Sequence, residues 1–133
     1  MKKYLLDTNI CIYFLKGQYD LHIKIENAGI ENCFVSEITV AELKYGVENS
    51  TQKAKNREIL EKFLARFAVI PIFSALDIYA KEEARLKTTG MVLDDFDLLI
   101  GATAITNKLS IVTRNISDFN RLDGIQIEDW TSQ

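Results

Sequence analysis

The fold is decided at residues 3–16, KYLLDTNICIYFLK, where an apolar run meets three polar residues and a second apolar run follows. The first four residues have the character of a short buried strand, and ICIYFLK continues with the periodicity of a helix. We therefore predict a strand that runs directly into a helix. Asp7 stands at the junction, so its side chain should point from the carboxyl edge of a sheet into a crevice.

Outward from this unit, strands and helices continue to alternate along the chain. Further strands are predicted at residues 33–35, 68–73 (AVIPIF), 109–113 (LSIVT) and in the tail GIQIEDW. Helices are predicted near 38–48 and 52–66, from Ser74 to before Gly90, and from Asp94 onward. The alternation favours an α/β fold, with a central parallel sheet of four or five short strands flanked by helices on both faces. We expect a single domain over residues 1–133.

The composition narrows the class of protein. A net charge of −3 argues against a protein that coats nucleic acid by bulk electrostatics. No apolar run approaches the roughly 20 residues of a membrane span, and the first residues do not resemble a signal peptide, so we expect a cytoplasmic protein without membrane segments. Cys11 and Cys33 lie in apolar surroundings and are predicted to be reduced core residues. His22 has no Ser or Cys placed to form a nucleophile pair with it.

Three acidic residues are candidates for a functional site, and each has an ordinary structural alternative. Asp7 follows the first strand, where an aspartate also serves to cap the next helix. Glu42 lies in the helical run TVAELKYG, and no cation stands at helical spacing to pair with it. The structural alternative is an ordinary solvent-facing glutamate. Asp97 ends the run DDFD at a helix start, where carboxylates interact favourably with the helix dipole. Gly101 and Ala104 follow it at helical spacing, and we expect this small-residue face to leave room for a ligand.

A fourth position follows the strand LSIVT. Here the carbonyl oxygen of Asn115 or the carboxylate of Asp118 could reach the same crevice, or either residue could simply cap the next segment. The predicted topology brings Asp7, Asp97 and this loop to one sheet edge, with Glu42 nearby on its helix. Crowded carboxylates require raised pKa values or a counter-cation, and hard divalent cations prefer oxygen ligands. Such a site can hydrolyse a phosphodiester without a protein nucleophile.

Four blocks of the chain resemble a known family in order and spacing: LLDTNICIYFL, EITVAELKYG, DDFDLLIGATAI and IVTRNISDFNRLDGIQIEDW. Together they are similar to the PIN domain of VapC-type toxins, and the resemblance covers essentially the whole chain. It implies a Mg²⁺- or Mn²⁺-dependent endoribonuclease that cleaves RNA, often a structured RNA such as tRNA. It also implies a VapB-type antitoxin that silences the enzyme, and a homodimer.

The resemblance assigns roles to particular residues. Asp7, Glu42 and Asp97 match the three acids that hold the metal in the family, while the family's fourth acidic position falls on Asn115. This amide should weaken a second metal site, and Asp118 and Asp95 are the two candidates for the missing charge.

Two neighbouring residues are secondary candidates within the same resemblance. Thr8 is expected to support the site through its hydroxyl. Arg114 is placed to contact a substrate phosphate or an antitoxin carboxylate. The expected hydrolysis leaves 5′-phosphate and 3′-hydroxyl ends.

Other interpretations share parts of this pattern. A receiver-like signalling module has a parallel sheet and an acidic edge, but it needs an aspartate after its central strand, and AVIPIFSALD has none before Asp77. A PIN domain that binds RNA or a partner without cleavage is the second alternative, which Asn115 keeps open. The preference for RNA over DNA rests on the resemblance alone. Apolar helical surfaces at residues 8–16 and 37–66 are candidate docking grooves for the antitoxin.

Overall fold

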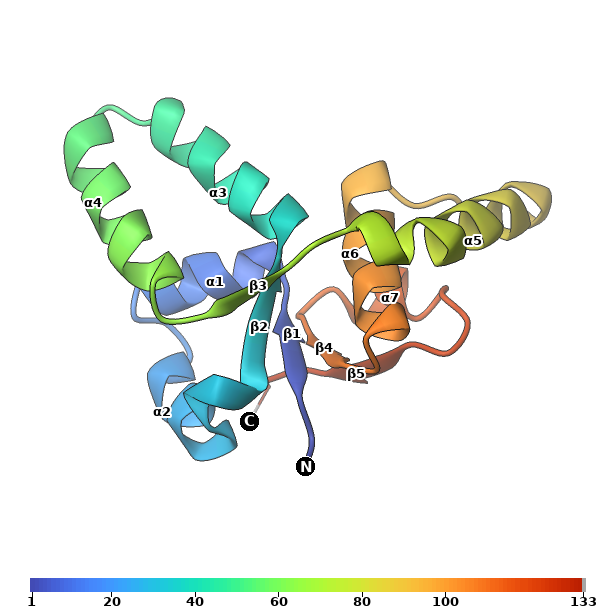
Figure 1. Ribbon diagram of the computed structural model, residues 1–133, viewed down its shortest axis with the longest axis horizontal. Helices are drawn as coiled ribbons and strands as arrows, with labels where there is room; N and C mark the ends of the chain where they lie inside the picture. The colour runs from blue at the N-terminus through green and yellow to red at the C-terminus, as the bar shows by residue number, and fades with distance from the viewer. Residues whose placement is uncertain (133) are drawn as a thin grey trace.

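The computed structural model describes residues 1–132 and contains a five-stranded parallel sheet with the strand order β3-β2-β1-β4-β5 (Figure 1). Each of the predicted strands is present, so the predicted α/β fold with a parallel sheet is confirmed. The strands are β1 (Tyr4–Leu6), β2 (Cys33–Ser36), β3 (Ala68–Ile70), β4 (Ser110–Val112) and β5 (Gln126–Glu128).

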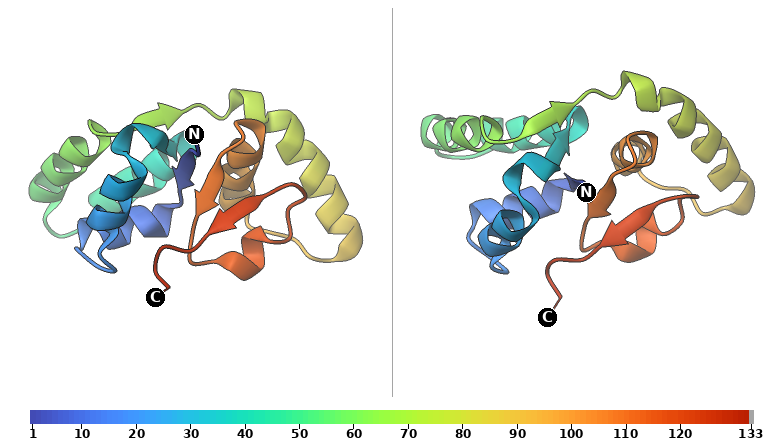
Figure 2. Two further views of the ribbon diagram at one scale, coloured as in Figure 1. Left: turned by 90° about the horizontal axis from the view of Figure 1, so that it is seen from below. Right: turned by 60° about the horizontal axis from the view of Figure 1, so that its bottom comes forward.

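Helices cover both faces of the sheet, as predicted (Figure 2). Helices α1 to α4 pack on one face and α5 to α7 on the other. Two short 3₁₀ helices, η1 (Ile30–Asn32) and η2 (Phe73–Ala75), precede β2 and α5. The helices are α1 (Thr8–Leu15), α2 (Leu21–Ala28), α3 (Glu37–Glu48), α4 (Lys53–Leu64), α5 (Leu76–Thr89), α6 (Asp95–Thr106) and α7 (Ile116–Phe119).

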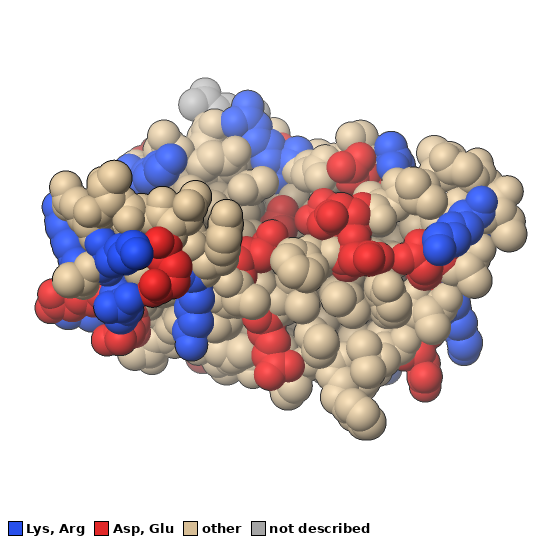
Figure 3. Space-filling view, turned by 90° about the horizontal axis from the view of Figure 1, so that it is seen from above, with Lys and Arg blue, Asp and Glu red and all other residues tan. Residues whose placement is uncertain are grey.

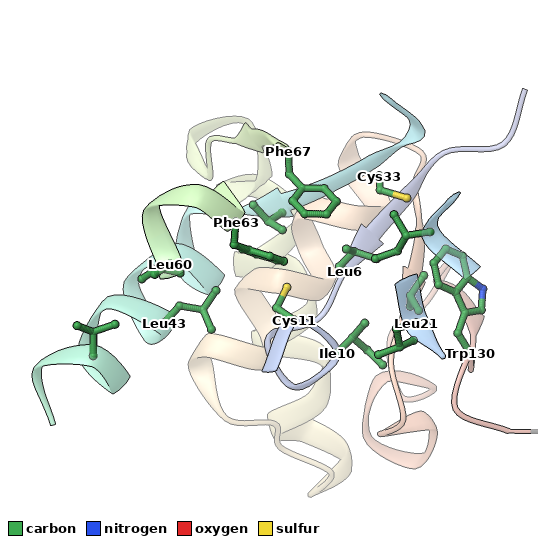
Figure 4. Packing of buried hydrophobic residues seen from close by; sticks show 14 residues of the cluster. Leu6, Ile10, Cys11, Leu21, Cys33, Leu43, Leu60, Phe63, Phe67 and Trp130 are labelled. Carbon is green, nitrogen blue, oxygen red and sulfur yellow. The ribbon is translucent and has the colours of Figure 1, made fainter. Parts of the chain in front are cut away.

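The alternation of side chains along β1 divides the core in two. Leu6 packs with the helices of one face, while Leu5 packs with those of the other, because successive side chains of a strand point to opposite faces. Phe63 and Phe67 close the first cluster over Leu6 (Figure 4), with a distance of 4.8 Å between their ring centroids. The two clusters bury Leu5 and Leu6 completely, and Asp7 follows directly at the carboxyl end of β1.

Both cysteines are buried free thiols, as predicted. Burial raises the pKa of the Cys11 thiol far above its usual range and that of Cys33 to about 11. Both thiols therefore stay protonated and inert at neutral pH. Among residues 1–132, none of the helices has the length and apolar character needed to cross a membrane.

The structure corrects two sequence-based expectations. Gly101 does not leave room for a ligand, because a Cβ added there would lie 2.3 Å from Cδ1 of Leu122. The small residue instead permits close packing of α6 against the segment that follows α7.

Of the predicted strand AVIPIF, only Ala68–Ile70 is a strand, β3, and it lies at the edge of the sheet, so the argument against a receiver-like module used the wrong strand. The central strand is β1, and Asp7 follows it directly. The receiver alternative is excluded by strand order instead, because flavodoxin-like folds have the order 2-1-3-4-5.

Candidate active site

Asp7 lies at the carboxyl end of the central strand and is only 4% exposed. Its Oδ1 accepts a hydrogen bond from the backbone N–H of Thr8 (2.8 Å), which makes it the N-cap of α1. Its Oδ2 accepts a second bond from the hydroxyl of Thr113 (2.8 Å), at the end of the neighbouring strand β4. Burial raises the pKa of Asp7, and these two donors oppose that rise. Asp7 is therefore both the N-cap of α1 and a candidate site residue, so the two interpretations of this residue are compatible.

Glu42 belongs to the site through a chain of hydroxyl groups. The hydroxyl of Thr8 donates to Oε1 of Glu42 (2.7 Å) and lies 3.0 Å from the hydroxyl of Thr39. Ser36, the N-cap of α3, in turn donates to Thr39 (3.4 Å). Each hydroxyl can donate to the next, so the chain runs from the end of β2 to the Glu42 carboxylate. Glu42 is therefore held toward α1 and does not behave as a freely solvated side chain.

Asp97 is partly buried in the first turn of α6. Its pKa is raised to about 6, first by burial and then by four carboxylates: Asp7, Asp94, Glu42 and Asp118. The repulsion between Asp7 and Asp97 is mutual, and we assign the larger rise to Asp97, because Asp7 has two donors that favour its ionised form. The structure thus brings the three predicted acids into one electrostatic cluster.

The fourth position of the candidate site, after β4, contains an amide paired with an acid. The side-chain nitrogen of Asn115 donates to Oδ2 of Asp118 (2.9 Å), and its backbone N–H donates to the Thr113 hydroxyl (2.9 Å). Asp95, the other candidate for the missing charge, accepts a hydrogen bond from the Tyr79 hydroxyl (3.1 Å) and is not among the charges that raise the Asp97 pKa. The geometry therefore favours Asp118 over Asp95.

Three polar residues at the site were missed from the sequence: Thr39, Thr113 and Asp94. The two threonines are fully buried, and their partners lie 31 and 106 residues away along the chain. The one feature of the sequence that could have indicated such a partner is Thr39, which lies one turn before Glu42 on the same helix. Asp94, where the sequence predicts a helix to begin, caps α6 by accepting a hydrogen bond from the Phe96 N–H (3.2 Å). Its charge also acts on Asp97.

Acidic side chains gather across the middle of the face at the carboxyl edge of the sheet, with basic side chains toward both ends (Figure 3). Within residues 1–132, neither Lys nor Arg forms an ion pair with Asp7, Glu42 or Asp97. Arg114 is exposed at the edge of this region and donates a hydrogen bond to the Tyr19 hydroxyl. Asp7, Glu42 and Asp97 thus have no ion-pair partner among the described residues, whereas Asp118 pairs with Arg121 (3.5 Å).

The donor set fits a hard divalent cation, because it consists of carboxylate, amide and hydroxyl oxygens. In the described part of the chain, no three acidic, histidine or cysteine side chains already converge as a closed ligand set. The types of residue present match the chemistry of such an ion. Hydroxyl groups hold Asp7 and Glu42, whereas Asp97 accepts no side-chain hydrogen bond within residues 1–132.

This fold and this arrangement of acids define the PIN-domain class. A family profile described as "PIN domain" matches residues 4–125, and the chain belongs to that family. Within it, the chain is a member of the VapC group. It is 35% identical over 130 residues to "Ribonuclease VapC2" of Rickettsia felis, covering 96% of this chain and 97% of that one. It is also 34% identical over 132 residues to "tRNA(fMet)-specific endonuclease VapC" of Salmonella typhimurium, covering 98% and 99%.

Solved structures support the same assignment. VapBC of Salmonella typhimurium bound to DNA contains a chain that superposes with a TM-score of 0.90 at 32% identity, covering 98% of this chain and 99% of that one. VapBC2 of Rickettsia felis, bound to a promoter DNA fragment, gives a TM-score of 0.87 at 32% identity, covering 96% and 98%. The resemblance recognised from four sequence blocks is confirmed.

Proposed function

We propose that the protein is a Mg²⁺- or Mn²⁺-dependent endoribonuclease and the toxin of a VapBC-type pair. The observation that carries this proposal is the environment of Asp97, where four other carboxylates raise its pKa. Of these four, only Asp118 has an ion-pair partner within residues 1–132, Arg121 at 3.5 Å. Such crowding is costly for folding unless a cation is bound, so its presence points to a metal site. The ribonuclease names of the relatives support RNA as the substrate.

The roles of the residues follow from their positions. Asp7 and Asp97 would hold the ion, and Glu42 would position the ion or its water, with Thr8 orienting Glu42. A bound divalent cation supplies polarisation of the phosphodiester and a water of lowered pKa. Asn115 would keep Asp118 in place at the weaker fourth position. The expected products carry 5′-phosphate and 3′-hydroxyl ends, because water would form the new bond to phosphorus while the bond between phosphorus and the 3′-oxygen would break.

A VapB-type antitoxin is the proposed partner, since the structural neighbours are VapBC complexes. An apolar groove of about 350 Å³ lies between α1, α3 and α4, with Glu42 at its border, within the predicted docking surfaces. An apolar antitoxin segment in this groove could bring a Lys or Arg to the acids. We also propose a homodimer, by analogy with the family, and a cytoplasmic site of action, where RNA is available. The groove residues are Ile12, Leu15, Leu43, Val47, Ile59 and Leu60.

Cleavage of total tRNA with added Mg²⁺, followed by sequencing of the 5′ ends, tests this function. The wild-type protein should cleave at defined sites, and excess EDTA should abolish cleavage. Asp7→Asn should reduce the rate at least a hundredfold, because the buried end of the metal site is lost. Asp77→Asn, which removes an exposed acid of α5, is the matched control and should leave the rate unchanged.

Two outcomes would contradict the proposal. Full activity of Asp7→Asn would remove Asp7 from the chemistry. RNA binding without any cleavage, at Mg²⁺ or Mn²⁺ concentrations that saturate the protein, would favour the alternative of a PIN domain that binds without cutting. The amide at position 115 is the feature that keeps this alternative open.

A further inference from the structure

Arg114 lies between two residues of the site. Thr113 before it donates a hydrogen bond to Asp7, and Asn115 after it donates to Asp118. The Arg114 side chain is exposed, and within residues 1–132 it forms no ion pair with a carboxylate. Its charge lowers the pKa of Asp129, but that carboxylate is bound by Thr131 and Ser132. Arg114 thus carries an unneutralised positive charge beside the acidic cluster.

Tyr19 holds this cation without neutralising it. The Arg114 guanidinium donates to the Tyr19 hydroxyl, and its carbon lies 5.3 Å from the centre of the Tyr19 ring. The phenol is uncharged, so four of the five guanidinium N–H donors and the full charge remain for another ligand. The Tyr13 ring packs edge-on against Tyr19, with 5.1 Å between the ring centroids, and connects this pair to α1.

The backbone that presents Tyr19 is strained. Tyr19 and Asp20 both adopt left-handed conformations, with φ values of 60° and 53°, although neither is glycine. Non-glycine residues occupy this region at an energetic cost, and two in succession occur mainly at the centre of a tight turn. The side chain of Asp20 makes no capping hydrogen bond to α2 that would account for the strain. The two residues are the centre of a turn that the Leu21 N–H closes by donating to the Gln18 carbonyl (3.4 Å), and this turn presents the Tyr19 ring and hydroxyl to Arg114.

We propose that Tyr19 is a positioning residue that holds Arg114 as a binding group for an RNA phosphate next to the scissile bond. This inference rests on the proposed function, because it requires RNA at the acidic site. A substrate phosphate is repelled by the carboxylates, and a fixed cation at their border offsets that repulsion. We take RNA as the ligand, because the proposed substrate must place phosphates at the acidic cluster. The groove proposed for the antitoxin, between α1, α3 and α4, does not include Arg114.

The test is binding of fluorescently labelled total tRNA at several KCl concentrations, with every protein carrying Asp7→Asn to prevent cleavage. Arg114→Gln should weaken binding about threefold to tenfold and reduce the salt slope of log K by about 0.7 to 0.9, the contribution of one phosphate contact. Lys87→Gln removes an exposed cation of α5 and should change the slope much less.

A double-mutant cycle separates positioning from general stability. Tyr19→Ala should weaken binding severalfold when Arg114 is present and have no effect when Arg114→Gln is already made. Tyr19→Phe keeps the ring and loses the hydroxyl, so its effect should be intermediate. In the cleaving enzyme, Arg114→Gln should raise KM severalfold and leave kcat within about twofold, because uniform substrate binding is lost.

Several results would overturn the inference. The inference is wrong if Arg114→Gln leaves the dissociation constant for tRNA and its salt slope unchanged. It is equally wrong if Arg114→Gln weakens binding of the antitoxin but not of tRNA. Equal effects of Tyr19→Ala with and without Arg114 would reduce Tyr19 to a structural role. If the wild-type protein cleaves tRNA and the Arg114→Gln variant binds tRNA as tightly as the protein with Arg114, only this inference fails. If the wild-type protein neither binds nor cleaves RNA, the proposed function fails as well.

Discussion

Asp97→Asn should stabilise the metal-free protein at neutral pH while it abolishes cleavage. The raised pKa of Asp97 means that the folded state binds its proton more tightly than the unfolded chain does. Its contribution to stability is therefore complete below the ordinary pKa of 3.8 and is lost as the pH rises to about 6. At pH 7.5 the folded protein bears the whole cost of an ionised Asp97. An asparagine has no charge to lose and removes this cost at every pH.

The size of the effect can be bounded. A rise from 3.8 to about 6 corresponds to at most about 3 kcal/mol, at 1.36 kcal/mol per pH unit. Asp97 is partly exposed, so solvent screening reduces this to about 1–2 kcal/mol. The substitution also removes a favourable charge from the first turn of α6, which costs about 0.3–1 kcal/mol. The net gain is about 1 kcal/mol, or an increase in Tm of about 3–6 °C for a chain of this size.

Urea and thermal unfolding in EDTA, at pH 4.5 and 7.5, measure this gain. Asp97→Asn should exceed the wild type at pH 7.5, and the difference should shrink at pH 4.5. Added Mg²⁺ should stabilise the wild type more than the variant, because a cation that binds only the folded state raises its stability. Asp95→Asn is the matched control, since it removes a charge from the same turn of α6 outside the cluster. If Asp97→Asn were no more stable than Asp95→Asn at pH 7.5 in EDTA, the electrostatic account of the site would be wrong.

Three further substitutions test other parts of the structure. Thr8→Val removes the hydroxyl that holds the site glutamate of α3 and should raise the Mg²⁺ concentration for half-maximal cleavage about tenfold. Thr106→Val removes a buried hydroxyl without a partner in the described chain and should leave this Mg²⁺ concentration unchanged. Asn115→Asp replaces a 2.9 Å hydrogen bond to Asp118 with repulsion and should cost about 1–2 kcal/mol of stability in EDTA, recovered on adding Mg²⁺; a loss that Mg²⁺ does not recover would argue against a metal at this position. Phe63→Ala, at a site 3% exposed, should lower the free energy of unfolding by about 3–5 kcal/mol in urea titrations, and a loss below 1 kcal/mol would contradict the packing described here.

The sequence was sufficient for the parts of the structure that depend on local pattern. The position of Asp7 followed from an apolar run that ends in DTN, because a strand end and a helix start leave distinct local signals. Strand order did not follow, since AVIPIF and KYLL are similar short apolar runs and only tertiary packing decides which is central. The small residue Gly101 is equally compatible with a ligand and with close packing. Close packing is what the structure shows, because Leu122, 21 residues further on, lies against Gly101.

The contrast between Asp7 and Asp97 explains how one cluster can be both stable enough to fold and ready for a cation. Asp7 is the more buried acid, but its two hydrogen-bond donors satisfy both oxygens and favour its charge. Within the described residues, the Asp97 carboxylate accepts no side-chain or capping hydrogen bond, although four like charges act on it. An ionised carboxylate without donors in such a place has its coordination completed by a cation at less cost than by rearranging the protein. In the proposed metal site Asp7 would thus be the preorganised ligand. The folding cost of the site would be concentrated on Asp97, where binding of the ion would offset it.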